Sequence, residues 1–360
     1  MSHSLRLFLL VFASLLAGCS TVPDKEPYDG PLSWPQPPDQ PRFAYEAVLH
    51  SSANIADVSE EASLRERFTG VKAASDQPVM DKPTAVVARK GRIYVLDTGA
   101  NNIVVFDVPR RKIFHMGLRE PGNLANPAGI ALDVDMNVYV ADSALRKIFV
   151  YDSYGFVTRI IGNPDVLDRP TGVAVSPDAQ RIYVVDRSFN ESNQHRVVVF
   201  DWFGNLLQVI GSRGTEDGQF NVPLQAAVAP DGTLYVLDSG NFRVQAFDKD
   251  GNFLRKFGEP GKSYGSFARP RGIAVDDDGL VYVSDAGFNN IQIFNPEGQL
   301  LLTIGQGSLV SNPGQYGMLS GIAVDELGKI YVVDQLFDKV EVIRRLSDSE
   351  GKQILEKSKE

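Results

Sequence analysis

The chain has 360 residues, 43% of them apolar and 22% charged, which is the composition of a soluble globular protein and excludes disordered and multi-span membrane classes. Its formal net charge of −9 argues against nucleic acid as a partner, because phosphates require clustered Lys and Arg. A single Cys excludes an intramolecular disulfide and a thiolate-rich metal site. Length alone would suggest two domains.

The N-terminus has the pattern of an export signal. Arg6 precedes the apolar run Leu7–Ala17, which is too short to cross a bilayer. The run leads into Leu-Ala-Gly-Cys19, which resembles the lipobox of bacterial lipoproteins. That resemblance implies a signal peptide over residues 1–18 and lipidation of Cys19 with acyl chains such as palmitate. The alternative is an ordinary secretory signal with a chance Cys.

The resemblance also implies a location. Ser20 stands where Asp would mark retention in the inner membrane, so we expect an outer-membrane lipoprotein facing the periplasm. Residues 19–41 would be the lipidated Cys and a tether, because seven prolines between residues 20 and 41 favour an extended polyproline chain. The lipid would be the only attachment to the membrane.

Six segments of the remaining chain repeat one pattern, in which a short apolar strand precedes Tyr-Val-x-Asp. The closing aspartates are spaced by 45, 44, 52, 47 and 49 residues. They are Asp97, Asp142, Asp186, Asp238, Asp285 and Asp334. Each unit has the residue types and turns of four short β-strands. A four-stranded unit at this period predicts an all-β fold, a six-bladed β-propeller over residues 42–345.

The repeated motifs resemble those of the NHL repeat family. The similarity lies in Pro-x-Gly-Ile-Ala-Val-Asp, in Tyr-Val-x-Asp and in a closing Phe-Gly or Ile-Gly, and it covers roughly residues 81–345. The resemblance implies the propeller fold. It says little about activity, because members of the family bind proteins or RNA in some branches and catalyse in others.

The ends of the chain must close the ring. The last repeat lacks a fourth strand, and the alternating segment Arg42–His50 is predicted to supply it. Gln353–Leu355 is the competing closing strand. Residues 346–360 are expected to form a charged tail, frayed or loosely helical. A capping box at Asp57–Glu60 predicts a short helix over Glu60–Arg67.

The repeated aspartates are predicted to be structural, because a short acceptor after a strand can bind the N–H groups of the next turn in every blade. Neither a metal nor a cofactor is expected. His50, His115 and His195 lack ligand spacing, so the resemblance to zinc-dependent amidating lyases of the family fails there. Asp276–Gly279 and Asp248–Asn252 lack the ligand spacing of calcium loops and occupy expected turns.

A binding surface is predicted where the loops before each first strand and after each second strand meet, at the mouth of the central channel. Two arginines among small polar residues suit an anionic group. Blade three also has an insertion, Ser188–Gln194. The candidate binding residues are Arg187, Arg271, Thr171, Ser320, Gln335 and Asn190. The alternative is a solvated rim without a ligand.

Two functions follow as hypotheses. The first is a monomeric, non-enzymatic binding scaffold for a protein or polymer of the cell envelope. The alternative is a metal-dependent propeller enzyme, of lyase or lactonase type, acting at the channel mouth.

Overall fold

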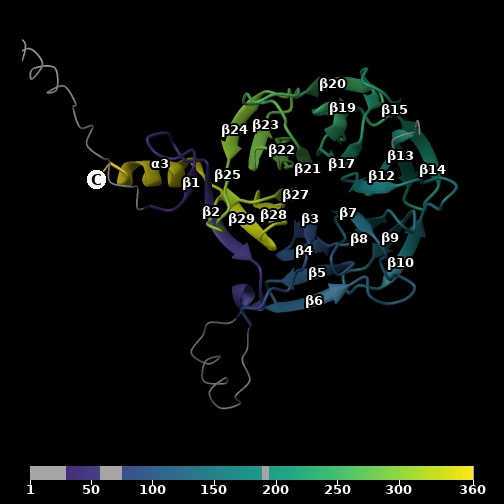
Figure 1. Cartoon of the computed structure of the whole chain (residues 1–360), viewed down its shortest axis with the longest axis horizontal. Helices are drawn as coiled ribbons and strands as arrows, with labels where there is room; N and C mark the ends of the chain where they lie inside the picture. Colours follow the sequence, from purple (N-terminus) through teal and green to yellow (C-terminus); the bar gives the residue numbers. More distant parts are fainter. Residues whose placement is uncertain (1–29, 57–74, 189–193, 360) are drawn as a thin grey trace, which may run out of the picture.

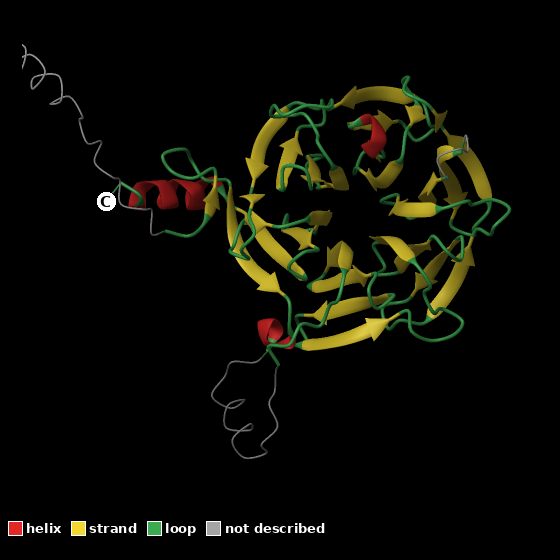
Figure 2. Cartoon of the chain, viewed as in Figure 1, coloured by secondary structure: helices red, strands yellow, loops and turns green. Residues whose placement is uncertain are grey.

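The computed structural model describes residues 30–56, 75–188 and 194–359. Six antiparallel sheets lie radially around one axis and form a six-bladed β-propeller, as the repeat predicts (Figure 1). Almost all regular structure in these residues is strand. Their helical elements are α3 (Asp348–Lys357) and the short 3-10 turns η1 (Ser52–Ile55) and η2 (Ser239–Asn241) (Figure 2). The two domains suggested by length are therefore one ring. No helix within the described ranges is long and apolar enough to cross a membrane.

Each of the first five blades has four strands, in chain order from the axis outward. Their bounds are β3 (Pro83–Arg89), β4 (Arg92–Asp97), β5 (Asn102–Asp107) and β6 (Lys112–Met116) in blade one; β7 (Pro127–Leu132), β8 (Val138–Asp142), β9 (Lys147–Tyr151) and β10 (Val157–Ile161) in blade two; β11 (Pro170–Val175), β12 (Arg181–Arg187), β13 (His195–Asp201) and β14 (Leu206–Ile210) in blade three; β17 (Pro223–Val228), β18 (Leu234–Asp238), β19 (Arg243–Phe247) and β20 (Phe253–Phe257) in blade four; and β21 (Pro270–Val275), β22 (Val281–Asp285), β23 (Asn290–Phe294) and β24 (Leu300–Ile304) in blade five.

The core lies between blades. The second and third strands of a blade are covered on both faces by neighbouring sheets, which is why their sequences are nearly continuous apolar runs. The tyrosine of each Tyr-Val-x-Asp motif fills the space between sheets; Tyr94, Tyr139 and Tyr282 are fully buried. The outer strands alternate between half-buried and exposed residues because successive side chains point to opposite faces, and only one face of an outer strand is packed.

Blade six is closed by the N-terminal strand, as predicted. It contains β27 (Leu319–Val324), β28 (Ile330–Asp334) and β29 (Lys339–Arg345), with β2 (Phe43–Leu49) antiparallel to β29 and β1 (Ser33–Trp34) outside it. Closure removes the free edge that β29 would otherwise present. The competing strand, Gln353–Leu355, lies in helix α3 instead.

The C-terminal tail is more ordered than the sequence analysis expected. In α3 the Glu350 carboxylate accepts the Ser347 N–H at 2.8 Å, and the Glu350 N–H donates to Ser347 Oγ at 3.3 Å. Arg344 also pairs with Glu350 at 2.7 Å. These bonds lower the pKa of Glu350 to about 2, and those with Ser347 form a capping box that starts the helix.

The helix predicted over Glu60–Arg67 lies outside the described residues, as does Cys19.

Two loops between blades contain short parallel pairs. They are β15 (Ser212–Arg213) with β16 (Gln219–Phe220) between blades three and four, and β25 (Gln306–Gly307) with β26 (Gln315–Tyr316) between blades five and six. Phe220 and Tyr316 are fully buried at the end of each pair. The aromatic side chains therefore fasten these loops to the blades.

Candidate functional site

The loop after each second strand lies against the loop before the first strand of the same blade. The N–H of Arg187 donates to the carbonyl of Arg169 at 3.0 Å, and that of Ala286 donates to Arg269 at 3.0 Å. The same bond recurs from Gln335 to Met318 at 2.9 Å. Both sets of loops therefore meet at one end of the ring, which we call the mouth face.

The six repeated aspartates lie directly beneath the mouth face and are all buried. Asp285 accepts backbone N–H groups from Ala268 at 2.8 Å, from Arg269 at 2.9 Å and from Gly287 at 2.7 Å. Each of the other five likewise accepts from the loop before its blade. The carboxylates thereby hold the two loops of each blade together, because a buried N–H needs an acceptor.

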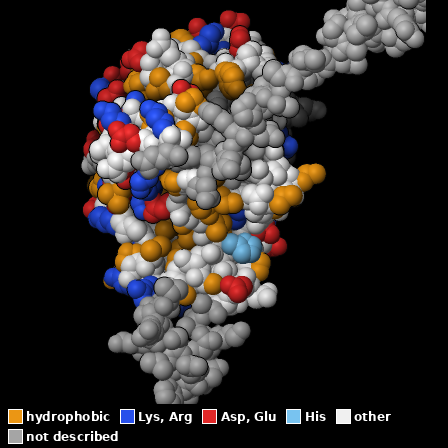
Figure 3. Space-filling model, turned by 90° about the vertical axis from the view of Figure 1, so that its left-hand side faces the viewer, with side chains coloured by type: hydrophobic (Ala, Val, Ile, Leu, Met, Phe, Trp, Pro, Cys, Tyr) orange, Lys and Arg blue, Asp and Glu red, His pale blue; other side chains and the backbone are white. Residues whose placement is uncertain are grey.

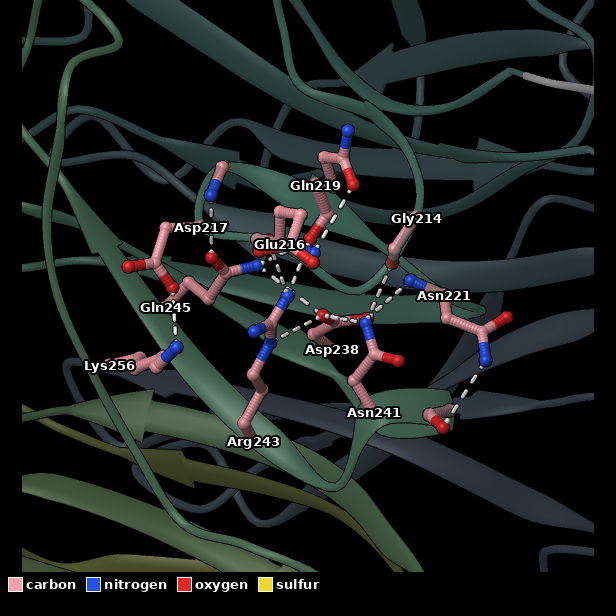
Figure 4. A network of polar contacts seen from close by, with 12 residues as sticks. Gly214, Glu216, Asp217, Gln219, Asn221, Asp238, Asn241, Arg243, Gln245 and Lys256 are labelled. Carbon is pink, nitrogen blue, oxygen red and sulfur yellow. Dashed lines mark hydrogen bonds and ion pairs between the residues drawn. The ribbon is translucent and has the colours of Figure 1, made fainter.

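In blade four an arginine adds to this arrangement (Figure 4). Arg243 Nε donates to Asp238 at 2.9 Å, and its Nη2 donates to the carbonyls of Glu216 and Gln219 at 2.8 and 2.9 Å. Burial raises the pKa of Asp238, while its hydrogen bonds and the charge of Arg243 oppose that rise. Arg243 is occupied by protein groups and holds the loop between blades three and four.

Two of the candidate binding residues join neighbouring blades. Ser320 Oγ donates to the carbonyl of Thr84 at 2.7 Å, across the junction of blades six and one. Thr171 Oγ1 donates to Pro223 at 3.4 Å, across the junction of blades three and four. Their hydroxyl protons are therefore used within the ring. Asn190 lies outside the described residues.

Arg187 and Arg271 differ from these hydroxyls. Both are half-buried, and neither side chain has a hydrogen bond or ion pair with the described part of the chain. Burial lowers the pKa of Arg271, and the charges of Arg269 and Arg187 lower it further. Burial and the charge of Arg169 act on Arg187 in the same direction. A guanidinium stays protonated even so, which leaves positive charge at the mouth with no carboxylate paired to it among the described residues.

Three further residues at this place were missed by the sequence analysis. Arg169 and Arg269 precede the prolines that open blades three and five, and His195 pairs with Arg187 between β12 and β13. Burial and the charges of Arg213 and Arg187 lower the pKa of His195. Its Nδ1 accepts the Val222 N–H at 2.8 Å, so the ring is neutral and fixed. The sequence did contain a signal for the two arginines, because the other four blades have no Arg directly before the first strand.

The two ends of the channel differ in charge. The channel encloses about 190 Å³ between mostly apolar inner strands. In its wall the Gln225 amide of blade four donates to the carbonyl of Thr171 in the adjacent blade three at 3.3 Å. The end opposite the mouth face is lined by five acidic residues, with Arg89 beside them. These residues are Asp133, Asp276, Asp277, Asp325 and Glu326. An anion would therefore be attracted to the mouth face and repelled from the other end.

Within the ranges that the structure describes, no group of three or more His, Cys, Asp or Glu side chains could hold a metal ion. The two segments weighed as calcium loops are turns between strands. Asp276 accepts from its own turn at Asp278 N and Leu280 N, at 3.0 and 2.8 Å, and Asp248 does the same at Asp250 N and Asn252 N.

The NHL repeat model matches residues 167–200, 220–247 and 267–294, which are the inner strands of blades three, four and five. The chain carries NHL repeats. The matched segments contain Arg187 and Arg271, so the candidate site lies within recognisable NHL blades.

Solved structures similar to this NHL propeller are also propeller proteins of varied description. A protein of unknown function from Bacteroides thetaiotaomicron is 17% identical with a TM-score of 0.60, covering 84% of this chain and 76% of that one. A gluconolactonase from Xanthomonas campestris is 16% identical (TM-score 0.59, 89% and 99% covered). Virginiamycin B lyase from Staphylococcus aureus is 17% identical (0.52, 74% and 97%). At such identities the likeness extends to the fold alone.

Proposed function

We propose that the protein is a lipid-anchored NHL-repeat propeller of the cell envelope that acts as a non-enzymatic binding scaffold, and that it binds an anionic protein or polymer partner at the mouth face. The observation that carries this proposal is the pair Arg187 and Arg271. They are half-buried at the mouth face and have no acidic partner among the described residues, although the net charge of the chain is −9.

A guanidinium that is partly desolvated gains more from a carboxylate or phosphate than one in open water, and it can bind such a group through two parallel hydrogen bonds. Arg169 and Arg269 surround the pair with further positive charge. The unmatched charge costs stability in the free protein, and an anionic ligand would remove that cost. The acidic opposite end of the channel favours binding at the mouth face alone.

The membrane attachment in this proposal comes from Cys19 and the lipobox pattern around it. An acylated Cys19 would hold the ring at the outer membrane, facing the periplasm, through the segment between Cys19 and residue 30, because residues 32–34 already pack on the ring. Export together with the net negative charge disfavours nucleic acid as the partner.

The second candidate is a metal-dependent enzyme acting at the mouth, since propellers named as a lyase and a lactonase share this fold. Metal analysis of the purified protein, with a melting curve in the presence of a chelator, separates the candidates. A stoichiometric divalent metal whose removal lowers the melting temperature would favour the enzyme.

Photocrosslinking in intact cells tests the binding role. A photoreactive residue at Gln335, on the mouth face, is expected to give an adduct, whereas one at the exposed Leu327 in the turn between β27 and β28 is not. Arg187→Ala with Arg271→Ala should abolish the Gln335 adduct without lowering the melting temperature. Adducts found only at Leu327 would place the partner at the end of the ring opposite the mouth face and would contradict this proposal.

A further inference from the structure

The loop over residues 305–318, between blades five and six, differs in chemistry from the other loops between blades. It has no Asp, Glu, Lys or Arg, whereas each of the other four such loops, over residues 117–126, 162–169, 211–222 and 258–269, has at least two. Leu309 and Val310 lie at its tip and are 91% and 60% exposed. Leu309 and Val310 are thus an adjacent pair of exposed aliphatic side chains in a loop without charge, the kind of surface feature that can mark a contact with a protein or a membrane.

The tip of this loop is held in place by its own hydrogen bonds. The N–H of Ser308 donates to Tyr316 at 2.9 Å, and that of Asn312 donates to Val310 at 3.0 Å. The Val310 N–H donates to Ser308 Oγ at 3.0 Å. Leu309 and Val310 are therefore presented outward by an ordered backbone and are not free to turn inward.

The first described residues of the chain lie against this same loop. The side chains of Leu32 and Trp34 pack on Gly314, where a Cβ would come within 2.6 Å of the Trp34 ring. Arg42, just before β2, pairs with Asp348 of α3. Figure 3 views the side of the molecule that carries β1, β2 and α3. Apolar and charged side chains are interspersed on that side (Figure 3). The chain thus leads away toward Cys19 from a point beside the uncharged loop.

The length of that connection limits how far the ring can stand from a membrane. From Cys19 to residue 30 the chain can extend at most about 36 Å, at roughly 3.3 Å per residue. The attachment point next to loop 305–318 is consequently the part of the ring that an anchored chain holds closest to the bilayer. The neighbouring loop 258–269 adds the exposed Tyr264 and Lys262, an aromatic and a cation suited to an anionic lipid surface.

We propose that loop 305–318 inserts Leu309 and Val310 into the phospholipid surface to which Cys19 is anchored, so that the ring is oriented by its sixth blade. This inference rests on the lipid anchor of the proposed function. Blade three, which carries Arg187, lies opposite blade six in the ring (Figure 1). Loop 305–318 belongs to the mouth face, since the Gln335 N–H donates to the carbonyl of Met318. Contact at this edge of the ring would therefore tilt the opposite side of the mouth face, which carries Arg187, away from the lipid.

A lipid quenching experiment tests this orientation. Because Cys19 is the only Cys and its sulfur is acylated in the anchored form, Leu309→Cys gives a full-length lipoprotein with one free thiol for an environment-sensitive dye. Leu327→Cys is the matched control, since Leu327 is 73% exposed in a turn at the opposite end of blade six. Both proteins are reconstituted into vesicles of phosphatidylethanolamine and phosphatidylglycerol carrying a spin-labelled lipid.

The dye at position 309 should be quenched at least about threefold more than the dye at position 327, because an inserted side chain reaches the acyl boundary. Equal quenching at the two positions in a lipidated protein would overturn the loop contact and leave the anchor standing. Labelling of the wild-type chain at Cys19, with failure to float with vesicles, would overturn the lipid anchor and the orientation that rests on it, whereas binding at Arg187 and Arg271 is tested separately by the crosslink at Gln335.

Discussion

The buried ion pair in blade six offers a sharp test of how the blades are built. Lys339 and Glu341 are 4% and 1% exposed, and their charged atoms are 2.6 Å apart. Glu341 Oε2 accepts the Gly314 N–H at 3.0 Å. In blade five the corresponding acceptor is Gln292, whose Oε1 takes the Gly265 N–H at 3.0 Å while its Nε2 donates to the Ser266 carbonyl. One neutral amide in blade five therefore does what two charged side chains do in blade six.

Glu341→Gln keeps the acceptor for Gly314 but leaves the Lys339 ammonium buried without its carboxylate. Breaking a buried pair in this way costs about 3–5 kcal/mol of unfolding free energy. Adding Lys339→Asn reproduces the pair Asn290 and Gln292 of blade five, and should bring the protein back to within about 1 kcal/mol of wild type. The double variant is therefore expected to be less destabilised than the sum of the two single substitutions.

Urea unfolding at neutral pH, followed by tryptophan fluorescence, measures all four members of this double-mutant cycle. Lys339→Asn alone is the remaining member and should also be destabilised, since it leaves Glu341 without the ammonium. The reasoning is refuted if Glu341→Gln costs less than about 1 kcal/mol, or if the double variant is no more stable than that single variant.

Three other predictions concern the closure, the aspartates and the tail. Deleting Phe43–Leu49 should abolish the cooperative melting transition, because β29 then has a free edge; an unchanged calorimetric transition would contradict closure by β2. Asp142→Ala should cost about 3 kcal/mol in urea unfolding, since four backbone N–H groups lose their acceptor, and a cost near zero would show that water replaces it. The pKa of Glu350, about 2 against 4.5, means that its contribution to α3 is present above pH 4.5 and lost as pH falls toward 2. Hydrogen exchange of residues 346–359 should therefore lose protection in acid in the wild type, whereas Glu350→Gln, which keeps an acceptor for the Ser347 N–H but does not titrate, should show the same protection at both pH values.

The blade count and the closing strand follow from the sequence because they depend on a repeat and on alternation, both of which are local patterns. The spacing of the repeated aspartates predicts six units, and the alternating segment before the first unit predicts the strand that joins β29. The order in α3 was underestimated. Its capping box at Ser347 and Glu350 is visible in the sequence, but the ion pairs from Arg42 and Arg344 that hold the helix come from distant or folded parts of the chain.

The candidate site is predictable only in part, for a physical reason. A position at the end of a strand indicates that Arg187 and Arg271 belong to the mouth face, but it does not reveal whether a carboxylate lies beside them. That depends on loops brought together from three blades. The roles of Thr171 and Ser320 were hidden for the same reason, since their acceptors lie on neighbouring blades.

The central claim is that Arg187 and Arg271, which have no acidic partner among the described residues, bind an anionic partner at the mouth face. The most direct measurement is the yield of the photocrosslinked adduct at Gln335 in intact cells, compared between the wild type and charge variants of Arg187 and Arg271. We expect replacement of both by Lys to leave a reduced yield, because the charge remains and the two-pronged hydrogen bonding is lost, and replacement of both by Glu to abolish the adduct. A yield in the double Glu variant equal to that of the wild type would contradict the account.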